Sequence, residues 1–305
     1  MSAAGNDCFE QVMCNVCGAD DPQEIYPATY KDDRAENIVE TFRSSGDETL
    51  VDRLVRCRRC GFQYLNPRLK AELVLQGYSG GEDQVFVSQA ESREKTFDEA
   101  LGSIEKMLPA KGRVLDVGTA GGSFLAVARR RGWETAGCEP NRWLCSWAGS
   151  HYGLAVTPGT IFDMRLADAS FDLVTLWDVL EHTPDPRRVL QECRRVLKPG
   201  GILVVNYPDI GSWIARMMGR RWVFLLSVHL YYFDRVTIRR LLKETGFEMT
   251  YSRPHWQKLE LDYILLRMQA YVPAVPGLFR KVFAALGLKN AKVAYWMGQT
   301  LAIAK

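Results

Sequence analysis

A stretch of small residues between a buried strand and a helix constrains the fold of this chain more than any other feature. Residues 113–117 (Arg-Val-Leu-Asp-Val) predict a short β-strand, and Gly-Thr-Ala-Gly-Gly follows at 118–122. Phe124, Leu125 and Ala128 then recur at helical spacing. Small residues let the backbone approach a ligand closely, and a helix N-terminus offers unpaired N–H groups to a polar or negative group. The segment therefore predicts a strand, a ligand-binding loop and a helix.

Strands and helices alternate through the rest of the chain from about residue 91. Further strands are expected at 134–139, 171–176, 202–206, 247–252 and 300–304. Apolar residues at helical spacing predict helices between them, such as 97–108 before Pro109 and 235–245 before Gly246. This alternation is typical of an α/β fold with a mostly parallel sheet covered on both faces.

Two segments do not fit the alternation. Residues 207–233 lie between a strand and the helix that follows it, and residues 254–298 separate the last two strands. Both segments are rich in aromatic and apolar side chains. Because ligand pockets of such sheets are usually built at the carboxyl ends of the strands, we expect these two insertions to shape a substrate pocket.

An acidic residue ends the second predicted strand. Glu139 lies 21 positions after Gly118, where a carboxylate can accept hydrogen bonds from both hydroxyls of a ribose. The loop and Glu139 together fit a dinucleotide or an adenosyl ligand, and a surface carboxylate is the other interpretation of Glu139.

Four segments resemble, in order and spacing, the motif series of class I methyltransferases. They are residues 115–124 (LDVGTAGGSF), 137–140 (GCEP), 171–182 (FDLVTLWDVLEH) and 196–203 (VLKPGGIL). The resemblance covers roughly residues 95–250 and is closest to the branch with a Cys-x-x-Cys-Gly pair in front and a His-Leu-x-Tyr-Phe motif after the fifth strand. It implies a Rossmann-like, seven-stranded sheet and S-adenosylmethionine as cofactor. One departure is Ala120, where the family usually has glycine, and it should tighten the pocket slightly.

The resemblance also implies roles for individual residues around the cofactor. Asp116 would order the methionyl amine, Gly118, Ala120 and Gly122 would pass under the methionine part, Glu139 would bind the ribose, Asp163 would accept from the adenine amino group, and Trp177 and Asp178 would border the sulfonium centre. Thr160 is the rival to Asp163 for the adenine contact.

Two histidines are candidates for a general base, which a hydroxyl acceptor would need near neutral pH. His229 lies in Val-His-Leu-Tyr-Tyr-Phe (228–233) at the end of the first insertion. His182 follows the strand at 171–176. The alternative for His182 is a residue that begins a helix and bonds to backbone, and Tyr231 and Tyr232 are expected as pocket wall or core.

Two matching cysteine pairs precede the α/β pattern. Cys14 and Cys17, and Cys57 and Cys60, each form Cys-x-x-Cys-Gly, and four thiolates can close a tetrahedral structural zinc site. A redox role for the pairs is the alternative. We therefore expect a zinc-ribbon-like module over residues 1–75 and a methyltransferase domain over residues 76–305. Four other cysteines are scattered along the chain, and of these Cys138, Cys145 and Cys193 are expected to be ordinary small apolar residues in or beside the core.

Composition and charge exclude several classes. The net charge is only +3, from 39 basic and 36 acidic residues, which argues against a nucleic-acid partner. The first residues carry no signal-peptide pattern and no stretch approaches a membrane span, so a cytoplasmic protein is expected. Residues 278–286 predict an amphipathic helix, which would act as a lid on the sheet or, within residues 263–290, contact a membrane surface.

These observations predict methyl transfer from S-adenosylmethionine to a small-molecule or saccharide acceptor, with a sugar or glycan hydroxyl as the first choice. The alternatives are C- or N-methylation of a specialised metabolite or nucleotide sugar, and a non-catalytic module that binds zinc and the cofactor. The motifs at 171–182 and 196–203 disfavour a nicotinamide oxidoreductase.

Overall fold

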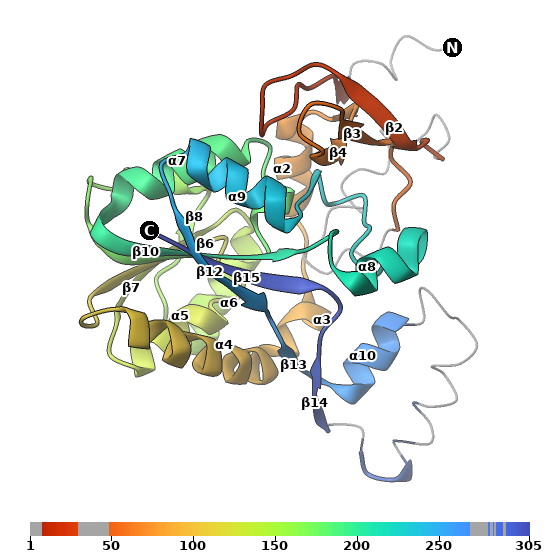
Figure 1. The fold of residues 1–305 in the computed structure, drawn as a ribbon. Coiled ribbons are helices and arrows are strands. Elements are labelled where there is room, and N and C mark those ends of the chain that lie inside the picture. The colour runs from red at the N-terminus through yellow and green to blue at the C-terminus, as the bar shows by residue number, and fades with distance from the viewer. Residues whose placement is uncertain (1–7, 30–48, 269–279, 281–282, 284, 289–290) are drawn as a thin grey trace.

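A seven-stranded sheet forms the centre of the structure (Figure 1). The structure is a computed structural model, and it describes residues 8–29, 49–268, 280, 283, 285–288 and 291–305. Its strand order is β12-β15-β10-β9-β6-β7-β8. The strands are β6 (Arg113–Val117), β7 (Glu134–Glu139), β8 (Thr157–Pro158), β9 (Phe171–Trp177), β10 (Leu197–Pro208), β12 (Met249–Pro254) and β15 (Gln299–Ala304). The Rossmann-like fold and the seven strands expected from the sequence are confirmed.

The sheet is mostly parallel, as predicted. The strands from β10 to β8 pair in parallel, whereas β15 runs antiparallel to both of its neighbours. The structure differs from prediction at β8, a two-residue edge strand that is too short to show a pattern, and at β10, which begins at Leu197 rather than at Ile202. The register of β10 against β9 shifts between those two residues, because the turn at Pro199-Gly200-Gly201 bulges out of the ladder.

Helices cover both faces of the sheet (Figure 1). One face carries α4 (Ala90–Ile104), α5 (Ser123–Arg130) and α6 (Arg142–Tyr152), and the other carries α7 (Pro186–Val196) and α9 (Arg235–Glu244). Neighbouring residues of one strand point to opposite faces, so Val114 packs with α4 and α5 while Leu115 packs with α7 and α9. Gly246 follows α9 with φ +87°, as expected of a residue that ends a helix.

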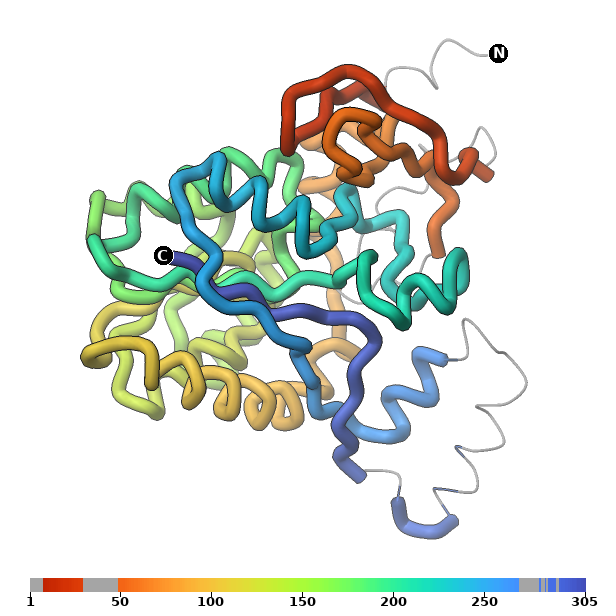
Figure 2. The backbone as a smooth tube through the Cα atoms, in the orientation of Figure 1, coloured from red at the N-terminus to blue at the C-terminus, as the bar shows by residue number. Residues whose placement is uncertain are grey.

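The N-terminal segment shares a second sheet with the first insertion. This sheet has the order β11-β4-β3-β2, in which β2 (Pro22–Tyr26), β3 (Leu54–Cys57) and β4 (Gln63–Leu65) precede the methyltransferase-like part and β11 (Tyr231–Tyr232) belongs to the insertion. A further bridge joins Thr49 to Leu226. Figure 2 shows the two segments side by side although they are far apart in the sequence. The division at residue 75 stays a prediction, since one hydrophobic cluster runs through both parts.

Smaller elements connect these parts. Strand β1 (Phe9–Glu10) pairs with β5 (Arg68–Leu69), and α2 (Ala71–Ser79) and α3 (Gln84–Val87) lead into α4. Within the first insertion, α8 (Trp213–Met218) follows β10.

The second insertion contains β13 (Gln257–Glu260), α10 (Leu261–Met268) and β14 (Lys292–Tyr295). Strand β13 attaches to α4 and the residue before it, because the N–H of Lys258 donates to Thr96 Oγ1 (2.8 Å) and that of Glu260 to Gln89 Oε1 (3.2 Å). The amphipathic helix predicted at 278–286 falls largely outside the described residues. None of the helices in the described part of the chain has the length and apolar character that a membrane crossing requires.

An aromatic cluster with one buried cation joins the second sheet to the rest of the protein. Phe62 stacks on Tyr231, with ring centroids 5.6 Å apart. The hydroxyl of Tyr231 accepts a hydrogen bond from Arg68 (2.6 Å) and donates one to the carbonyl of Pro184 (2.9 Å). Arg68 is buried and also pairs with Glu10. One phenol therefore links three separate segments of the chain.

Removing that hydroxyl should destabilise the protein. Tyr231→Phe leaves a guanidinium N–H and a carbonyl buried without their partner, so we expect the free energy of unfolding to fall by about 1–3 kcal/mol. Urea denaturation followed by tryptophan fluorescence measures the change. Tyr251→Phe, at an exposed position, is the matched control and should change stability little. Equal stability of the two variants would contradict the role given to the Tyr231 hydroxyl.

Candidate functional site

The predicted cofactor residues meet at one edge of the sheet. Asp116 lies near the carboxyl end of β6, Glu139 ends β7, and Trp177 ends β9. These strands are parallel neighbours, so their carboxyl ends lie at the same edge. Trp177 was expected just past its strand, but it still pairs with Asn206 of β10 and is the last strand residue.

The loop after β6 uses a backbone conformation that favours glycine. Gly118, Ala120 and Gly122 have φ values of +69°, +48° and +80°. A Cβ on Gly118 would lie 2.8 Å from Val179 Cγ2, so only glycine fits there. Ala120 carries its Cβ in the left-handed region, at a typical cost of about 1–2 kcal/mol. Backbone strain of this kind often occurs at functional sites, and here it lies in the loop at the carboxyl end of β6.

Glu139 is fully buried and fastens that loop to the end of β7. One carboxylate oxygen accepts from the N–H of Ala120 and the other from the N–H of Asn141, both at 2.8 Å. Burial raises the pKa of Glu139 to about 7, although both N–H groups oppose the shift. The side chain of Tyr78 also hydrogen-bonds to Glu139. An ionised carboxylate has about four lone-pair sites, so Glu139 can still accept from a hydroxyl of a ligand.

A segment that the sequence analysis left as a connection covers this part of the site. The side-chain amide of Asn141 donates to the carbonyl of Tyr78 in the last turn of α2 (2.9 Å) and to that of Gly81 just after α2 (2.7 Å). A Cβ on Gly121 would touch Trp147 of α6 at 3.1 Å and Val87 of α3 at 3.5 Å. The α2–α3 segment is therefore a wall of the site, and no motif in it indicated this role.

Asp116 is the second buried carboxylate of the edge. It is 1% exposed, and the hydroxyl of Thr175 on β9 donates to it at 2.6 Å. Burial raises the pKa of Asp116 to about 7. A carboxylate held this way can pair with the positively charged amine of a ligand, which would repay its desolvation.

The two rival residues for the adenine contact bond to each other. Asp163 lies in the 3₁₀-helix Ile161–Met164 and accepts from the N–H and the hydroxyl of Thr160, both at 2.7 Å. These hydrogen bonds lower the pKa of Asp163. Both bonds use the same carboxylate oxygen, so the other oxygen is available to an amino group.

Trp177 and Asp178 lie where the second insertion reaches the edge. The Trp177 ring packs 5.1 Å from Phe97 and 5.4 Å from His255 (centroid to centroid), and His255 precedes β13. Asp178 has φ +54°, and its carboxylate accepts from the side-chain amide of Asn206 at 2.7 Å. Burial raises the pKa of Asp178 to about 6. Asn206 is a site residue that the sequence analysis missed, inside a run of strand residues.

The two candidate bases come together. The rings of His182 and His229 are 4.7 Å apart, and each Nδ1 faces a backbone carbonyl: Val228 O at 3.0 Å from His182 and Phe224 O at 2.9 Å from His229. Burial lowers the pKa of His182 to about 4, and it also lowers the pKa of His229 well below its usual value. Neutral rings protonated on Nδ1 satisfy both carbonyls and leave Nε2 as an acceptor.

Glu181 is the third member of this group, and sequence analysis gave it no role. It lies in the 3₁₀-helix Leu180–His182 and is 1% exposed. Neither carboxyl oxygen has a hydrogen-bond partner among the described residues. One ligand atom each of Glu181, His182 and His229 lie within 4.8 Å of one another. The Leu-Glu-His motif contained the signal, because it places a carboxyl directly beside a histidine.

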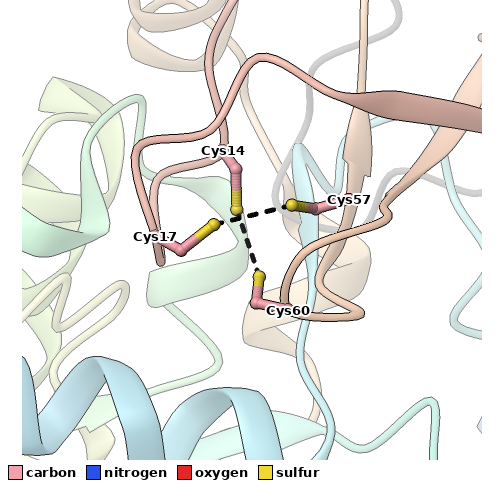
Figure 3. A group of neighbouring side chains, drawn as sticks. All are labelled: Cys14, Cys17, Cys57 and Cys60. Carbon is pink, nitrogen blue, oxygen red and sulfur yellow. Dashed lines mark hydrogen bonds between the residues drawn. The ribbon is translucent and has the colours of Figure 1, made fainter.

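The four paired cysteines form a separate cluster, in which all four side chains point toward one another (Figure 3). Their sulfur atoms lie within 4.8 Å of one another, with Cys14 Sγ 3.5 Å from Cys60 Sγ and Cys17 Sγ 3.5 Å from Cys57 Sγ. A tetrahedron with Zn–S bonds of about 2.3 Å needs sulfur atoms about 3.8 Å apart. The donor set and its spacing therefore fit a tetrahedral thiolate-bound metal. Cys138, Cys145 and Cys193 are buried, as predicted.

Solved structures share the fold of this chain. A SAM-dependent methyltransferase from Archaeoglobus fulgidus superposes with a TM-score of 0.50 at 17% identity, over 73% of this chain and 100% of that one. A putative methyltransferase from an antibiotic biosynthesis pathway of Anabaena variabilis superposes with a TM-score of 0.50 at 15% identity, over 68% of this chain and 96% of that one. At such identities the likeness establishes the fold alone.

Curated relatives match about a third of the chain. The ubiquinone biosynthesis O-methyltransferase of Paracidovorax citrulli is 39% identical over 109 residues, which are 33% of this chain and 46% of the relative. The enzyme of the same name from Hahella chejuensis is 42% identical over 102 residues, 32% of this chain and 42% of the relative. The chain thus spans less than half the length of these curated relatives.

The profile of the methyltransferase domain family matches residues 90–252, more than half of the chain. This range contains Asp116, the loop at residues 118–122, Glu139 and the end of β9. The chain belongs to the methyltransferase domain family, whose cofactor is S-adenosylmethionine.

Proposed function

We propose that the protein transfers a methyl group from S-adenosylmethionine to a hydroxyl of a small-molecule or saccharide acceptor. The observation that carries this proposal is the pair of buried carboxylates, Asp116 and Glu139, on the two strands beside the left-handed loop. A buried carboxylate is stable in its ionised form only when a partner compensates its charge. S-adenosylmethionine has ribose hydroxyls that could donate to Glu139 and an ammonium group that could pair with Asp116.

The cofactor supplies a methyl group already activated on a sulfonium, whose sulfur leaves neutral. The residues of this chain therefore have to bind, align and exclude water rather than activate the donor. Glu139 would hold the ribose, Asp116 the amine, and the free oxygen of Asp163 the adenine amino group. The Trp177 ring, packed between Phe97 and His255, would form an apolar wall beside the methyl group.

A hydroxyl acceptor is supported by the names of the relatives, which are O-methyltransferases. The proposal of a sugar or glycan acceptor rests on the resemblance to the branch of class I methyltransferases that has a Cys-x-x-Cys-Gly pair in front of the domain. C- or N-methylation and a non-catalytic module stay the alternatives. The base roles of His182 and His229 also stay predictions, and a free imidazole with a pKa of about 4 would be a weak base at neutral pH.

Cofactor affinity should depend on pH through the two buried carboxyls. Because their pKa values are raised to about 7, a proton competes with the ligand below pH 7, and the affinity for S-adenosylmethionine should rise from pH 6 to pH 8. Glu139→Gln should weaken binding of S-adenosylmethionine by about 1–3 kcal/mol at pH 8. The affinity of this variant should also change less with pH, because only Asp116 would still titrate. Titration calorimetry measures both effects.

Glu134→Gln is the matched control, since Glu134 begins the same strand at an exposed position. It should bind like the wild type. Normal binding by Glu139→Gln would refute the ribose assignment, and tighter binding of NAD than of S-adenosylmethionine would refute the proposed function.

The acceptor class can be tested with a methyl-labelled donor. Incubation with nucleotide sugars, glycans and phenols should place the label on an oxygen atom of a sugar, as read by mass spectrometry and NMR of the product. Label on carbon or nitrogen would overturn the O-methylation proposal. Omission of the protein, and a Gly118→Val variant whose side chain would clash with Val179, serve as controls and should give no labelled product.

We also propose that Cys14, Cys17, Cys57 and Cys60 bind one structural zinc ion. With four thiolates the coordination is closed, so the ion would hold the 39-residue loop between Cys17 and Cys57 rather than take part in chemistry. The turn between Cys14 and Cys17 is hydrogen-bonded to Arg187 of α7, which also pairs with Glu244 of α9. A bound ion would therefore help to hold the second sheet against these helices.

About one zinc per chain should survive dialysis against EDTA and be released when a mercurial blocks the thiols. Cys57→Ser should lose this zinc and unfold at a lower temperature, because metal binding stabilises only the folded chain. Cys8→Ser, which changes a cysteine outside the cluster, should keep it. A thiol-released zinc content far below one per chain in the wild type would contradict the proposal.

A further inference from the structure

A second group of metal-ligand side chains lies apart from the cysteines, where the first insertion meets the end of β9. Glu181 and His182 come from the 3₁₀-helix after β9, and His229 comes from the insertion, two residues before β11. Their ligand atoms lie within 4.8 Å of one another, although His182 and His229 are 47 positions apart in the sequence. Glu181 and His229 are buried and His182 is half-buried. The tertiary structure alone creates this group.

Both imidazoles are oriented as metal ligands usually are. Each turns Nδ1 toward a backbone carbonyl, Val228 O for His182 (3.0 Å) and Phe224 O for His229 (2.9 Å). Such a carbonyl fixes the tautomer with its proton on Nδ1 and leaves the Nε2 lone pair for a cation. The pattern occurs on two neighbouring rings, so their two free nitrogens belong to one small region.

The carboxyl group of Glu181, which lies beside these two nitrogens, lacks a hydrogen-bond partner in the described structure. It is 1% exposed, and among the described residues neither oxygen accepts or donates a hydrogen bond. Buried polar side chains are almost always satisfied, and an unpaired buried carboxylate is strongly unfavourable. No basic side chain is hydrogen-bonded or ion-paired to it in the described structure, whereas two imidazole nitrogens lie beside it. A cation bound by all three residues would compensate the charge of Glu181 and would use both free imidazole nitrogens.

We propose that Glu181, His182 and His229 bind one divalent transition-metal cation at the acceptor side of the methyltransferase site. Two imidazole nitrogens and one carboxylate oxygen favour Zn²⁺, Fe²⁺, Co²⁺ or Mn²⁺ over Ca²⁺ and Mg²⁺, which prefer oxygen ligands throughout. Three protein ligands also leave coordination positions open, in contrast to the closed cysteine cluster.

An open coordination position on the cation could bind the acceptor hydroxyl, and this part of the inference rests on the proposed function. An acceptor hydroxyl bound to the cation has a lowered pKa and releases its proton to water. The resulting oxygen forms a bond to the methyl carbon while the carbon–sulfur bond breaks and the sulfur keeps the electron pair. His182 and His229 would then hold the cation that activates the acceptor instead of taking its proton.

Cobalt binding tests the site directly, on the full-length protein after EDTA dialysis that retains thiolate-bound zinc. Calorimetry with Co²⁺ should show one equivalent per chain, and the visible spectrum should lack the intense sulfur-to-cobalt band of a cysteine site. Glu181→Gln, His182→Gln and His229→Gln should each weaken Co²⁺ binding by about 100-fold or more, since loss of outer partners alone typically costs 10–100-fold. His255→Gln, another buried histidine outside the group, should bind as the wild type does.

Folding of each variant is checked by its affinity for S-adenosylmethionine, which the inference expects to be unchanged. Co²⁺ should also raise the unfolding temperature of the wild type but not of His229→Gln. Absence of a cobalt equivalent in the wild type would overturn the inference, as would equal binding by His229→Gln; Glu181 would then be protonated and donate to an imidazole. Cobalt binding needs neither cofactor nor acceptor, so its failure is distinguishable from failure of the proposed function.

Discussion

The pairing of β11 with β4 is the contact on which the arrangement of the functional residues depends. It joins a strand of the first insertion to the sheet that carries the cysteine pairs, and it buries Tyr231 against Phe62 and Arg68. A two-residue strand has little stability by itself, so the insertion is ordered by the N-terminal segment and the segment by the insertion. His229 lies two residues before β11 and thereby reaches His182. The sheet that includes Cys57 thus also fixes the position of His229, through its pairing with β11.

Burial of charge is the second organising feature. The edge of the large sheet gathers Asp116, Glu139, Asp178 and Glu181, all with raised pKa values because burial disfavours the ionised form. Backbone N–H groups and neighbouring hydroxyl and amide side chains offset part of that cost for the first three. Glu181 has no such compensation in the described structure. Ligands that bring positive charge or hydrogen-bond donors would therefore stabilise this edge.

Prediction from sequence worked where a signal is local. The strand at Arg113–Val117, the glycine loop after it and the strand ending at Glu139 were all located correctly, because alternating burial, small residues and helix ends are read from neighbouring positions. The cysteine pairs were recognised by the same means, and the sulfur atoms do meet. The start of β10 was predicted too late, and no strand was predicted at β8, β13 or β14, which are short or pair with strands far along the chain. Segment 71–89 gave no pattern that tied it to the cofactor loop.

The sequence by itself determined the α/β class, the order of the strands along the chain, and the types of residue that end them, since these follow from hydrophobic period and backbone preference. It also determined that four thiols would be available in two turns. Only the tertiary structure decided which residues share a site: that β11 completes the N-terminal sheet, that α2 and α3 wall the loop, and that Glu181, His182 and His229 meet. Those contacts join residues far apart in the sequence, and their free energy comes from packing and burial that exist only once the whole chain has folded.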